Sequence, residues 1–249
     1  MFLSNEYIVT FNEINEIIVK KKNLPNPVRT YPALPNFRCK ICQSPYVSTE
    51  KCRNHEGLKT DSKCYPHRVF TIGYYEYDYT SKMAGNQLTK DIFFARSSLD
   101  SGMIKIFGKI IYEIIKIHNL SPSHLSFIPS REESNILTLS LVEIVSKALN
   151  LEFIDSSQFI EIDYKEPIRD ESKFDIRSKN IKNTFLIKND EREVFGIEKL
   201  LLIDDIMHFG LTLNHFCQIF LKKSDVNEIE AIVLARSIPY RFNKRKLFL

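Results

Sequence analysis

The residues best suited to chemistry include an acidic pair in the last quarter of the chain. Asp204 and Asp205 directly follow the aliphatic run 200–203, and a turn containing Gly210 and Thr212 comes next. Such a run predicts a strand buried on both faces, so the two carboxylates should emerge at its carboxyl end. Ligands of open α/β sheets bind at that end. Two adjacent carboxylates favour a partner such as a sugar diol or a hydrated Mg²⁺.

The turn after the acidic pair is suited to a phosphate group. Gly210 can adopt backbone angles that aim several N–H groups at one point, and the positive end of the following helix favours an anion. Thr212 either adds a hydroxyl to the same anion or caps the helix. Apolar residues at helical spacing predict that helix: Leu213, Phe216, Cys217, Phe220 and Leu221.

The order of strand, Asp, Asp, turn, Gly, x, Thr resembles the motif of type I phosphoribosyltransferases that binds 5-phosphoribosyl 1-pyrophosphate (PRPP). The wider pattern resembles the ComF family, in which a zinc finger precedes that domain. The resemblance implies that PRPP binds with Mg²⁺ and that its ribose hydroxyls meet the catalytic residues Asp204 and Asp205. It implies that the 5′-phosphate lies in the loop made by Ile206, Met207, His208, Phe209, Gly210, Leu211 and Thr212.

The chain departs from the family in its phosphate loop. Two threonines usually precede the glycine, where this chain has His208 and Phe209. Hydrogen bonds to a charged phosphate contribute roughly 1.5–3 kcal/mol each, so losing two weakens binding by about two to four orders of magnitude. A protonated His208 recovers part of that loss.

Two further segments carry the resemblance. The strand and loop 125–131 stand where the family binds pyrophosphate, but this chain keeps only Arg131 there and lacks the family's Arg-Gly-Phe-Asn-Gln run. Residues 177–185 read Arg-x-x-Asn-x-x-Asn-x-Phe, which resembles the ComF segment before the acidic strand. This polar stretch is interpreted either as a lid that excludes water or as a solvated surface connection.

Cysteine and histidine spacing near the start of the chain predicts a structural Zn²⁺ in a tetrahedral site. The first residues lack the basic and apolar regions of a signal peptide, so we expect a cytoplasmic protein with reduced thiols rather than disulfides. The candidate pairs are Cys39 with Cys42, Cys52 with His55, and Cys64 with His67. The first two pairs match the ComF finger, which usually has Cys at the fourth place, and the third pair is an alternative.

Composition sets the scale of the molecule. With 249 residues, 43% of them hydrophobic, the chain is long enough for one large domain and a small appendage. No apolar run approaches the roughly 18 residues that span a bilayer, so no membrane insertion is expected. A net charge of +4 permits nucleic acid or phosphorylated ligands without requiring either.

These features predict a parallel-sheet α/β fold of the type I phosphoribosyltransferase kind. Residues 1–37 form an N-terminal extension and proline-containing linker, residues 38–67 the zinc finger, and residues 68–249 the large domain with its basic tail. Alternating aromatic residues at 68–80 predict a strand, whose tyrosines either pack against neighbours or stack on bases. Strands at 125–128, 200–203 and 229–235 and helices at 99–118, 130–149 and from 213 onward complete the predicted domain.

Two functions are consistent with this pattern. In the first, an enzyme transfers a phosphoribosyl group from PRPP to an unknown acceptor through an oxocarbenium-like state, with Mg²⁺ offsetting the charge of the leaving pyrophosphate. In the second, a non-catalytic module binds single-stranded DNA or a protein partner, as the resemblance to competence proteins in DNA uptake suggests. Interleaved basic and aromatic residues in the tail would contact a phosphate backbone: Arg236, Tyr240, Arg241, Phe242, Lys244, Arg245 and Lys246.

Overall fold

The computed structural model describes residues 6–13, 16–31, 66–78, 83–129, 134–158, 160–162, 185–187, 196–208 and 210–237. Several predicted site residues lie outside these ranges, and their roles stay predictions. They are Cys39, Cys42, Cys52, His55, Cys64, Arg131 and Phe209, together with the basic residues after Ser237.

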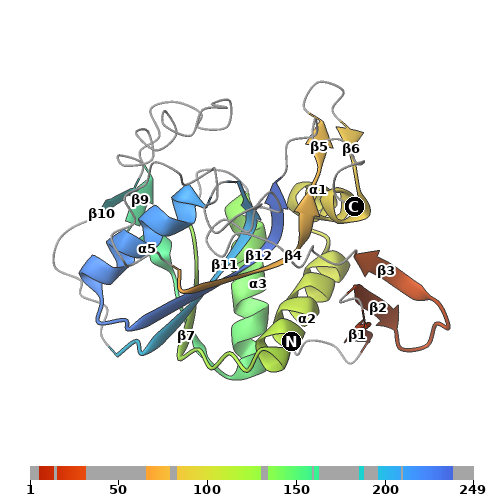
Figure 1. The fold of residues 1–249 in the computed structure, drawn as a ribbon, viewed down its shortest axis with the longest axis horizontal. Coiled ribbons are helices and arrows are strands. Elements are labelled where there is room, and N and C mark those ends of the chain that lie inside the picture. The colour runs from red at the N-terminus through yellow and green to blue at the C-terminus, as the bar shows by residue number, and fades with distance from the viewer. Residues whose placement is uncertain are drawn as a thin grey trace.

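A five-stranded sheet, parallel throughout, forms the centre of the molecule (Figure 1). Its strand order is β4-β12-β11-β7-β8, so the acidic strand β11 lies in the middle. The four aliphatic residues that directly precede the acidic pair on β11, 200–203, are almost completely buried, as expected of a run covered on both faces. The predicted parallel α/β class is therefore confirmed. The strands are β4 (Arg68–Tyr75), β7 (His124–Phe127), β8 (Glu152–Ile154), β11 (Lys199–Met207) and β12 (Glu228–Ser237).

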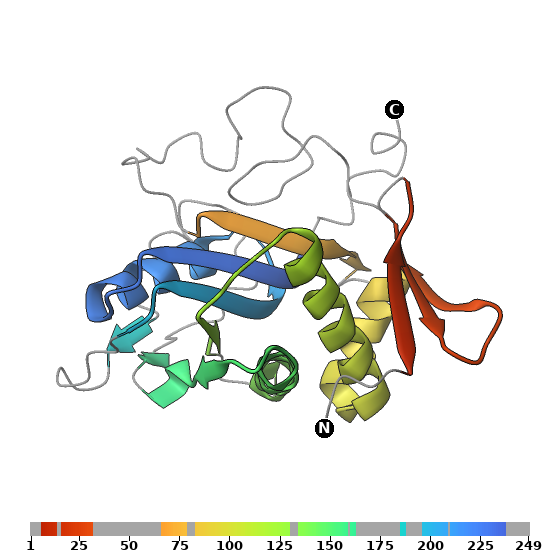
Figure 2. The ribbon, with the colours of Figure 1, turned by 90° about the horizontal axis from the view of Figure 1, so that it is seen from below.

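Helices cover both faces of this sheet. Leu201 packs in the core shared with α1, α2 and α3, whereas its neighbour Leu202 packs in the core shared with α5. Figure 2 shows α1 and α2 gathered beside the N-terminal strands, with α5 away from them. The helices are α1 (Gln87–Ser98), α2 (Ser101–Ile117), α3 (Ser134–Leu149) and α5 (Leu211–Lys223).

The chain changes direction across the sheet between β7 and β11. From β7 the chain runs through α3 to β8, the neighbour on one side, and α3 lies on the first face. From β11 it runs through α5 to β12 on the other side, and α5 lies on the second face. Strands β7 and β11 are hydrogen-bonded neighbours, so a topological switch point lies between their carboxyl ends.

Helix α1 was not among the predicted elements. It begins after Asn86, whose side chain accepts the Thr89 N–H at 2.8 Å, and it ends at Leu99 in the left-handed conformation. Asp100 then caps α2 in the same manner, with its carboxylate accepting the third N–H of that helix. The predicted helix 99–118 corresponds to α2.

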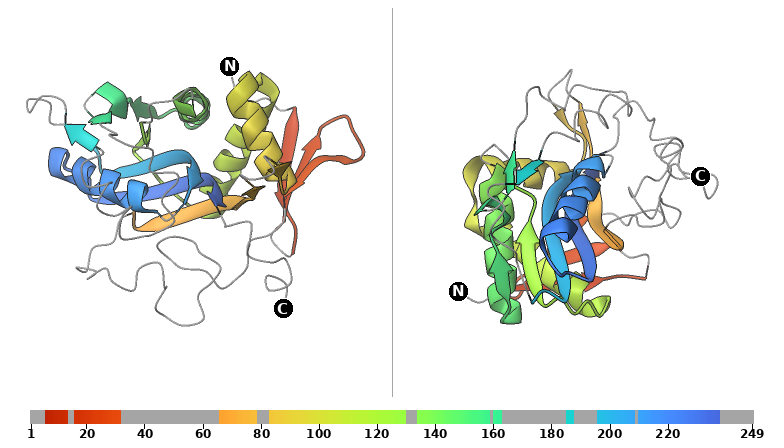
Figure 3. Two further views of the ribbon diagram at one scale, coloured as in Figure 1. Left: turned by 90° about the horizontal axis from the view of Figure 1, so that it is seen from above. Right: turned by 90° about the vertical axis from the view of Figure 1, so that its left-hand side faces the viewer.

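The first described segment, which lies within the predicted N-terminal extension, is a three-stranded antiparallel sheet. Its strands are β1 (Tyr7–Phe11), β2 (Ile17–Lys21) and β3 (Pro27–Tyr31), in that spatial order. Val9, Val19 and Tyr31 from its three strands lie in the core with α1 and α2. Figure 3 shows this sheet standing against the two helices.

A buried carboxylate on α1 fixes the N-terminal sheet. Asp91 is 3% exposed, and its Oδ2 accepts the Tyr31 hydroxyl at 2.9 Å and the Arg29 Nε–H at 2.8 Å. Its Oδ1 accepts the side-chain amide of Gln87 at 2.8 Å. Burial, with the negative charge of Asp91 beside it, raises the pKa of the Tyr31 phenol. The sheet is therefore joined to the main domain by polar bonds as well as by apolar packing.

Short antiparallel pairs complete the described elements. Strand β5 (Tyr77–Asp78) pairs with β6 (Met83–Ala84), and β9 (Ile160–Ile162) pairs with β10 (Phe185–Ile187), which is the described end of the predicted lid. Tyr75 on β4 is buried in the core, so this tyrosine packs rather than offering a surface for bases. In the described part of the chain, no helix has the length and apolar character to cross a bilayer.

Candidate functional site at the carboxyl edge of the sheet

The acidic pair lies on β11 itself, because the strand is longer than its aliphatic run. Pairing with β12 continues from Asp204 opposite Val233 to Met207 opposite Arg236. The sequence predicted that the strand would end where the aspartates begin, but the adjacent apolar residues of β12 extend the ladder by three residues beyond Asp204. The carboxylates are thus held by strand geometry rather than by a loop.

Strand geometry also separates the two carboxylates. Successive residues of a strand point to opposite faces, so Asp205 shares the face of Leu201 and Ile203, toward α1. Asp204 shares the face of Leu202, toward α5. The two side chains therefore occupy different chemical environments.

Asp205 is buried and forms an ion pair with Arg96 in the last turn of α1. The Arg96 Nε–H donates to Asp205 Oδ2 at 2.6 Å, and a terminal nitrogen of the same guanidinium contacts that oxygen. The other oxygen, Oδ1, accepts the Ile206 N–H at 2.6 Å. Asp205 is 6% exposed, and 25% of the Arg96 side chain is exposed. Charge-assisted bonds at these distances fix both groups.

Asp204 is half-buried and differs in its bonding. Its Oδ1 accepts the Asp205 N–H at 2.9 Å. Burial, together with the negative charge of Asp205, raises the pKa of the Asp204 carboxyl to about 8, although the positive charge of Arg96 acts in the opposite direction. A carboxyl of this kind exchanges its proton near neutral pH.

The turn after β11 leads into the start of α5. Gly210 has φ 73°, a left-handed conformation that few residues with side chains adopt, and its carbonyl accepts the Asn214 N–H at 2.9 Å. The first N–H groups of a helix have no acceptor within the helix itself, and in α5 these include the N–H groups of Leu211, Thr212 and Leu213. Together they form a site that favours an anion.

Side chains of the predicted phosphate loop are not equally available to a ligand. Met207 is buried in the core with α5, so it offers only its backbone. Ile206, His208 and Thr212 are half-buried, and His208 stands at the bend between strand and helix.

Arginine residues that sequence reasoning missed or misplaced lie at this edge. Arg236 was assigned to the basic tail, but it belongs to β12 and is 4% exposed. Its guanidinium donates to the carbonyl of Met207 at 3.3 Å and to the carbonyl of Ser237. Arg96 was not singled out at all. An Asn N-cap before Leu88, Ile92 and Ala95 would have predicted its helix, but no pattern connects Arg96 with an aspartate 109 residues later.

The neighbouring strand β7 forms the other side of the switch point. Its last residue, Phe127, accepts the Ser156 hydroxyl at its carbonyl, and Ser126 donates its own hydroxyl to the Ile154 carbonyl at 2.7 Å. These bonds join β7 to β8 and the turn that follows β8. The described part of β7 is therefore rigidly held.

No cluster of candidate metal ligands lies among the described residues. Among them no group of three or more His, Cys, Asp or Glu side chains gathers as metal ligands. The two aspartates point to opposite faces, and Arg96 neutralises Asp205.

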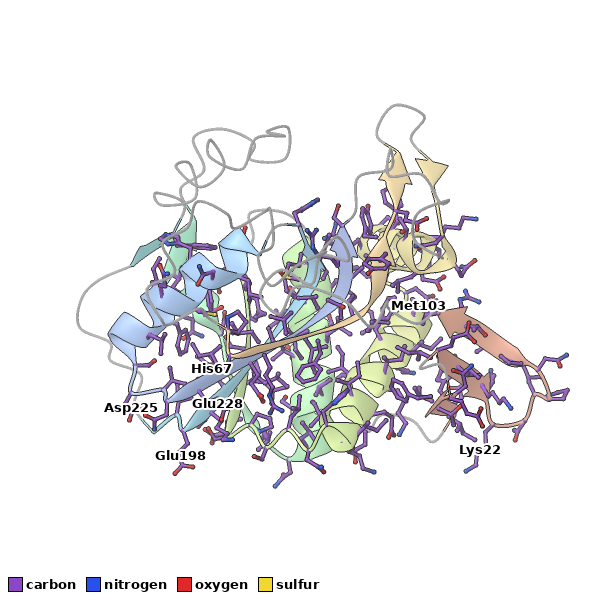
Figure 4. The ribbon with its side chains drawn as sticks, in the orientation of Figure 1. Lys22, His67, Met103, Glu198, Asp225 and Glu228 are labelled. Carbon is purple, nitrogen blue, oxygen red and sulfur yellow. The ribbon has the colours of Figure 1, made fainter. Side chains whose placement is uncertain are left out.

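The amino edge of the sheet has a different character. Figure 4 places His67, Glu198, Asp225 and Glu228 together at that edge. The ring Nδ1 of His67 lies 3.1 Å from the Ile229 nitrogen and 3.2 Å from the Ile229 carbonyl oxygen, so either neutral tautomer of the imidazole has a backbone partner. His67 therefore stays a predicted alternative ligand of Zn²⁺. The cysteines predicted to bind Zn²⁺ lie outside the residues that the structure describes.

Comparison with known proteins gives similarity to solved structures only. No family model matches the sequence, and no curated protein matches it. Adenine phosphoribosyltransferase from Leishmania tarentolae is 13% identical over 56% of this chain and 73% of that chain, with a TM-score of 0.35. A hypoxanthine phosphoribosyltransferase from Staphylococcus aureus is 15% identical over 64% and 83%, with a TM-score of 0.33. That from Trypanosoma cruzi is 17% identical over 60% and 75%, with a TM-score of 0.34. Similarity at this level does not assign a function to this chain.

Proposed function

We propose that this chain binds a phosphorylated ribose of the PRPP class at the carboxyl edge of the sheet, beside the switch point between β7 and β11. The observation that carries the proposal is the continuous path from the acidic pair on β11 through Gly210 into the N-terminus of α5. This path joins a group that accepts hydrogen bonds from a diol to a group of N–H donors suited to a phosphate.

The two ends of such a ligand meet different chemistry in this proposal. The 5′-phosphate accepts hydrogen bonds from the first N–H groups of α5, with the positive end of the helix beside it. A ribose hydroxyl donates to the carboxylate of Asp204. Binding favours the ionised carboxylate, so it releases the proton that Asp204 holds in the free protein.

Phosphoribosyl transfer is the reaction that this arrangement would serve. The bond from the anomeric carbon to pyrophosphate breaks, pyrophosphate leaves with the bonding electrons, and a nucleophilic acceptor supplies the new bond. The residues of the chain hold the sugar and its 5′-phosphate while that exchange occurs. The replacement of the family's threonines by His208 and Phe209 predicts weaker binding of the 5′-phosphate than in the enzymes that the sequence resembles.

Calorimetric titration tests this proposal. Ribose 5-phosphate, PRPP with Mg²⁺, unphosphorylated ribose and a single-stranded oligonucleotide would each be added to wild type and to Asp204→Asn. The proposal predicts that both phosphorylated sugars bind wild type. Unphosphorylated ribose should bind at least about a hundredfold more weakly, because it lacks a charged group. Asp204→Asn should bind none of the three sugars.

Asp225→Asn provides a control at the amino edge, where Asp225 accepts the Gly196 N–H. This variant should bind ribose 5-phosphate as wild type does. Salt-sensitive binding of the oligonucleotide without any binding of the phosphorylated sugars would contradict the proposal and support the nucleic-acid alternative.

A further inference from the structure

We propose that Arg96 is a positioning residue that neutralises Asp205 and leaves Asp204 as the one carboxylate of the pair that a ligand meets. This inference rests on the proposed function, because it divides the roles within the same site. The resemblance to phosphoribosyltransferases had implied equal roles for the two aspartates, so the inference also changes that expectation.

The hydrogen bonds of the two carboxylates support the division. Asp205 uses about three of the roughly four acceptor positions of a carboxylate, two toward Arg96 and one toward the Ile206 N–H. Asp204 accepts a single N–H, that of Asp205, among the described residues. Only Asp204 therefore keeps most of its capacity to accept bonds from hydroxyl groups.

Burial supports the same division. Asp205 is buried on the face that α1 covers, and Arg96 closes over it from the last turn of that helix. Asp204 is half-buried on the opposite face. A ligand at the carboxyl edge can thus reach Asp204 without displacing an ion pair.

The charge of the site follows from this arrangement. The charges of Arg96 and Asp205 cancel. The three side chains together therefore carry at most one net negative charge, and Asp204 provides it. Without Arg96, two adjacent carboxylates would repel, and the pKa of Asp204 would rise further. The charged groups that shift the pKa of Asp204 are Asp205 on the same strand and Arg96 on α1.

The test combines five variants with two measurements. Arg96→Met, Asp205→Asn, the double variant with both changes, Asp204→Asn and the control Arg29→Met would be compared with wild type. Arg29 forms an ion pair with the buried Asp91, which lies on α1, the helix that also carries Arg96. Arg29→Met therefore also removes the cation from a buried carboxylate, but at a position outside the proposed site. The measurements are ribose 5-phosphate affinity between pH 6 and 9 and the midpoint of thermal unfolding.

The inference predicts a specific pH dependence. Arg96→Met should bind about tenfold or more weakly than wild type at pH 7 and recover toward pH 9, since one unit of pKa shift changes the ionised fraction tenfold. A general structural defect would instead lower the affinity equally at every pH. Arg29→Met should follow the wild-type pH profile.

The double variant is decisive, because it replaces an ion pair of zero net charge by two uncharged side chains. It should regain thermal stability relative to Arg96→Met and bind ribose 5-phosphate within about threefold of wild type at pH 7, a difference below 1 kcal/mol. Asp204→Asn should lose binding at every pH. A double variant that binds as poorly as Asp204→Asn would overturn the inference, because Asp205 would then be a ligand-binding group.

Failure of the proposed function would be visible separately. If wild type binds no phosphorylated sugar, the proposed function is wrong, and the thermal data alone decide the inference. Destabilisation by Arg96→Met that is largely reversed by adding Asp205→Asn supports the pairing. Additive losses in the double variant overturn it.

Discussion

At the scale of single residues, Asp204 is an unusual carboxyl group for its place in the described structure. It is an ionisable group within a central strand, and burial followed by repulsion from Asp205 raises its pKa to about 8. The folded protein therefore keeps a proton that the unfolded chain releases near pH 4. A group that costs stability in its charged form is expected at a binding site rather than in a purely structural position.

Asp204→Asn should stabilise the protein while abolishing ligand binding. Stability of wild type falls as pH rises from about 4 through 8, because over that range the unfolded chain releases the Asp204 proton while the folded protein keeps it. The asparagine variant lacks this loss, so at pH 9 it should exceed wild type by at least ~2 kcal/mol, with little difference near pH 4. Urea unfolding at a series of pH values measures this. Equal stability of the two proteins at pH 9 would contradict the raised pKa.

Asp225 offers a control of opposite sign. Hydrogen bonds from the N–H groups of Gly196 and Ile197 lower the pKa of its carboxyl. Asp225→Asn should therefore lower stability at neutral pH, and the difference should disappear in acid as the wild-type carboxyl becomes protonated. The same urea series provides this comparison, and a variant more stable than wild type at pH 7 would be inconsistent with it.

At the scale of elements, the connection from β11 into α5 depends on a left-handed residue. Gly210→Ala should cost about 1 kcal/mol through backbone strain and should also lower ribose 5-phosphate affinity, because the turn aims the first N–H groups of α5. Gly196 is a matched control: its φ is 79°, a side chain there would meet no neighbouring atom within 4 Å, and it lies before β11. Gly196→Ala should show the same loss of stability with unchanged affinity. Equal effects of both changes on affinity would argue against the proposed phosphate site.

The joint between the N-terminal sheet and α1 makes a second prediction at this scale. Asp91→Ala leaves Arg29, Tyr31 and Gln87 without their shared acceptor, so it should lower the free energy of unfolding by roughly 3–5 kcal/mol. Lys90→Ala, an exposed neighbour on α1, should change it by about 0.5 kcal/mol or less. Chemical denaturation of both variants provides the comparison. A loss near 1 kcal/mol for Asp91→Ala would mean that apolar packing alone holds the sheet.

At the scale of the whole molecule, sequence patterns predicted the elements whose burial is simple. Continuous apolar runs predicted β11 and β12, and regular helical spacing predicted α2 and α5. Helix α1 was not predicted from the sequence because its buried side includes Thr89 and Asp91, which interrupt the apolar pattern. The apolar runs at 7–11 and 17–19 are compatible with short strands or with one helix, so they do not by themselves predict β1 and β2. Strand β3 was missed because the prolines around it resemble a linker, and packing against the helices shows the three strands to be part of the core.

The candidate site was predictable only in part. The acidic pair, the turn and the helix that follows are contiguous, so their combination can be recognised in the sequence. The partners that distinguish the two aspartates come from distant segments: Arg96 approaches from α1, and β12 extends the strand that separates the two side chains. Contacts of this kind depend on the order of strands and helices, which spacing along the chain does not encode.

The most direct measurement of the central claim is the change in backbone amide NMR resonances when ribose 5-phosphate is added to the isotope-labelled protein. Binding at the carboxyl edge predicts the largest changes in the N–H resonances of Gly210, Leu211 and Thr212 and in those of Asp204 and Asp205. It predicts little change at the amino edge, around Gly196 and Lys199. Unchanged resonances at the start of α5, or changes confined to the amino edge, would contradict a phosphorylated-sugar site at the carboxyl edge of the sheet.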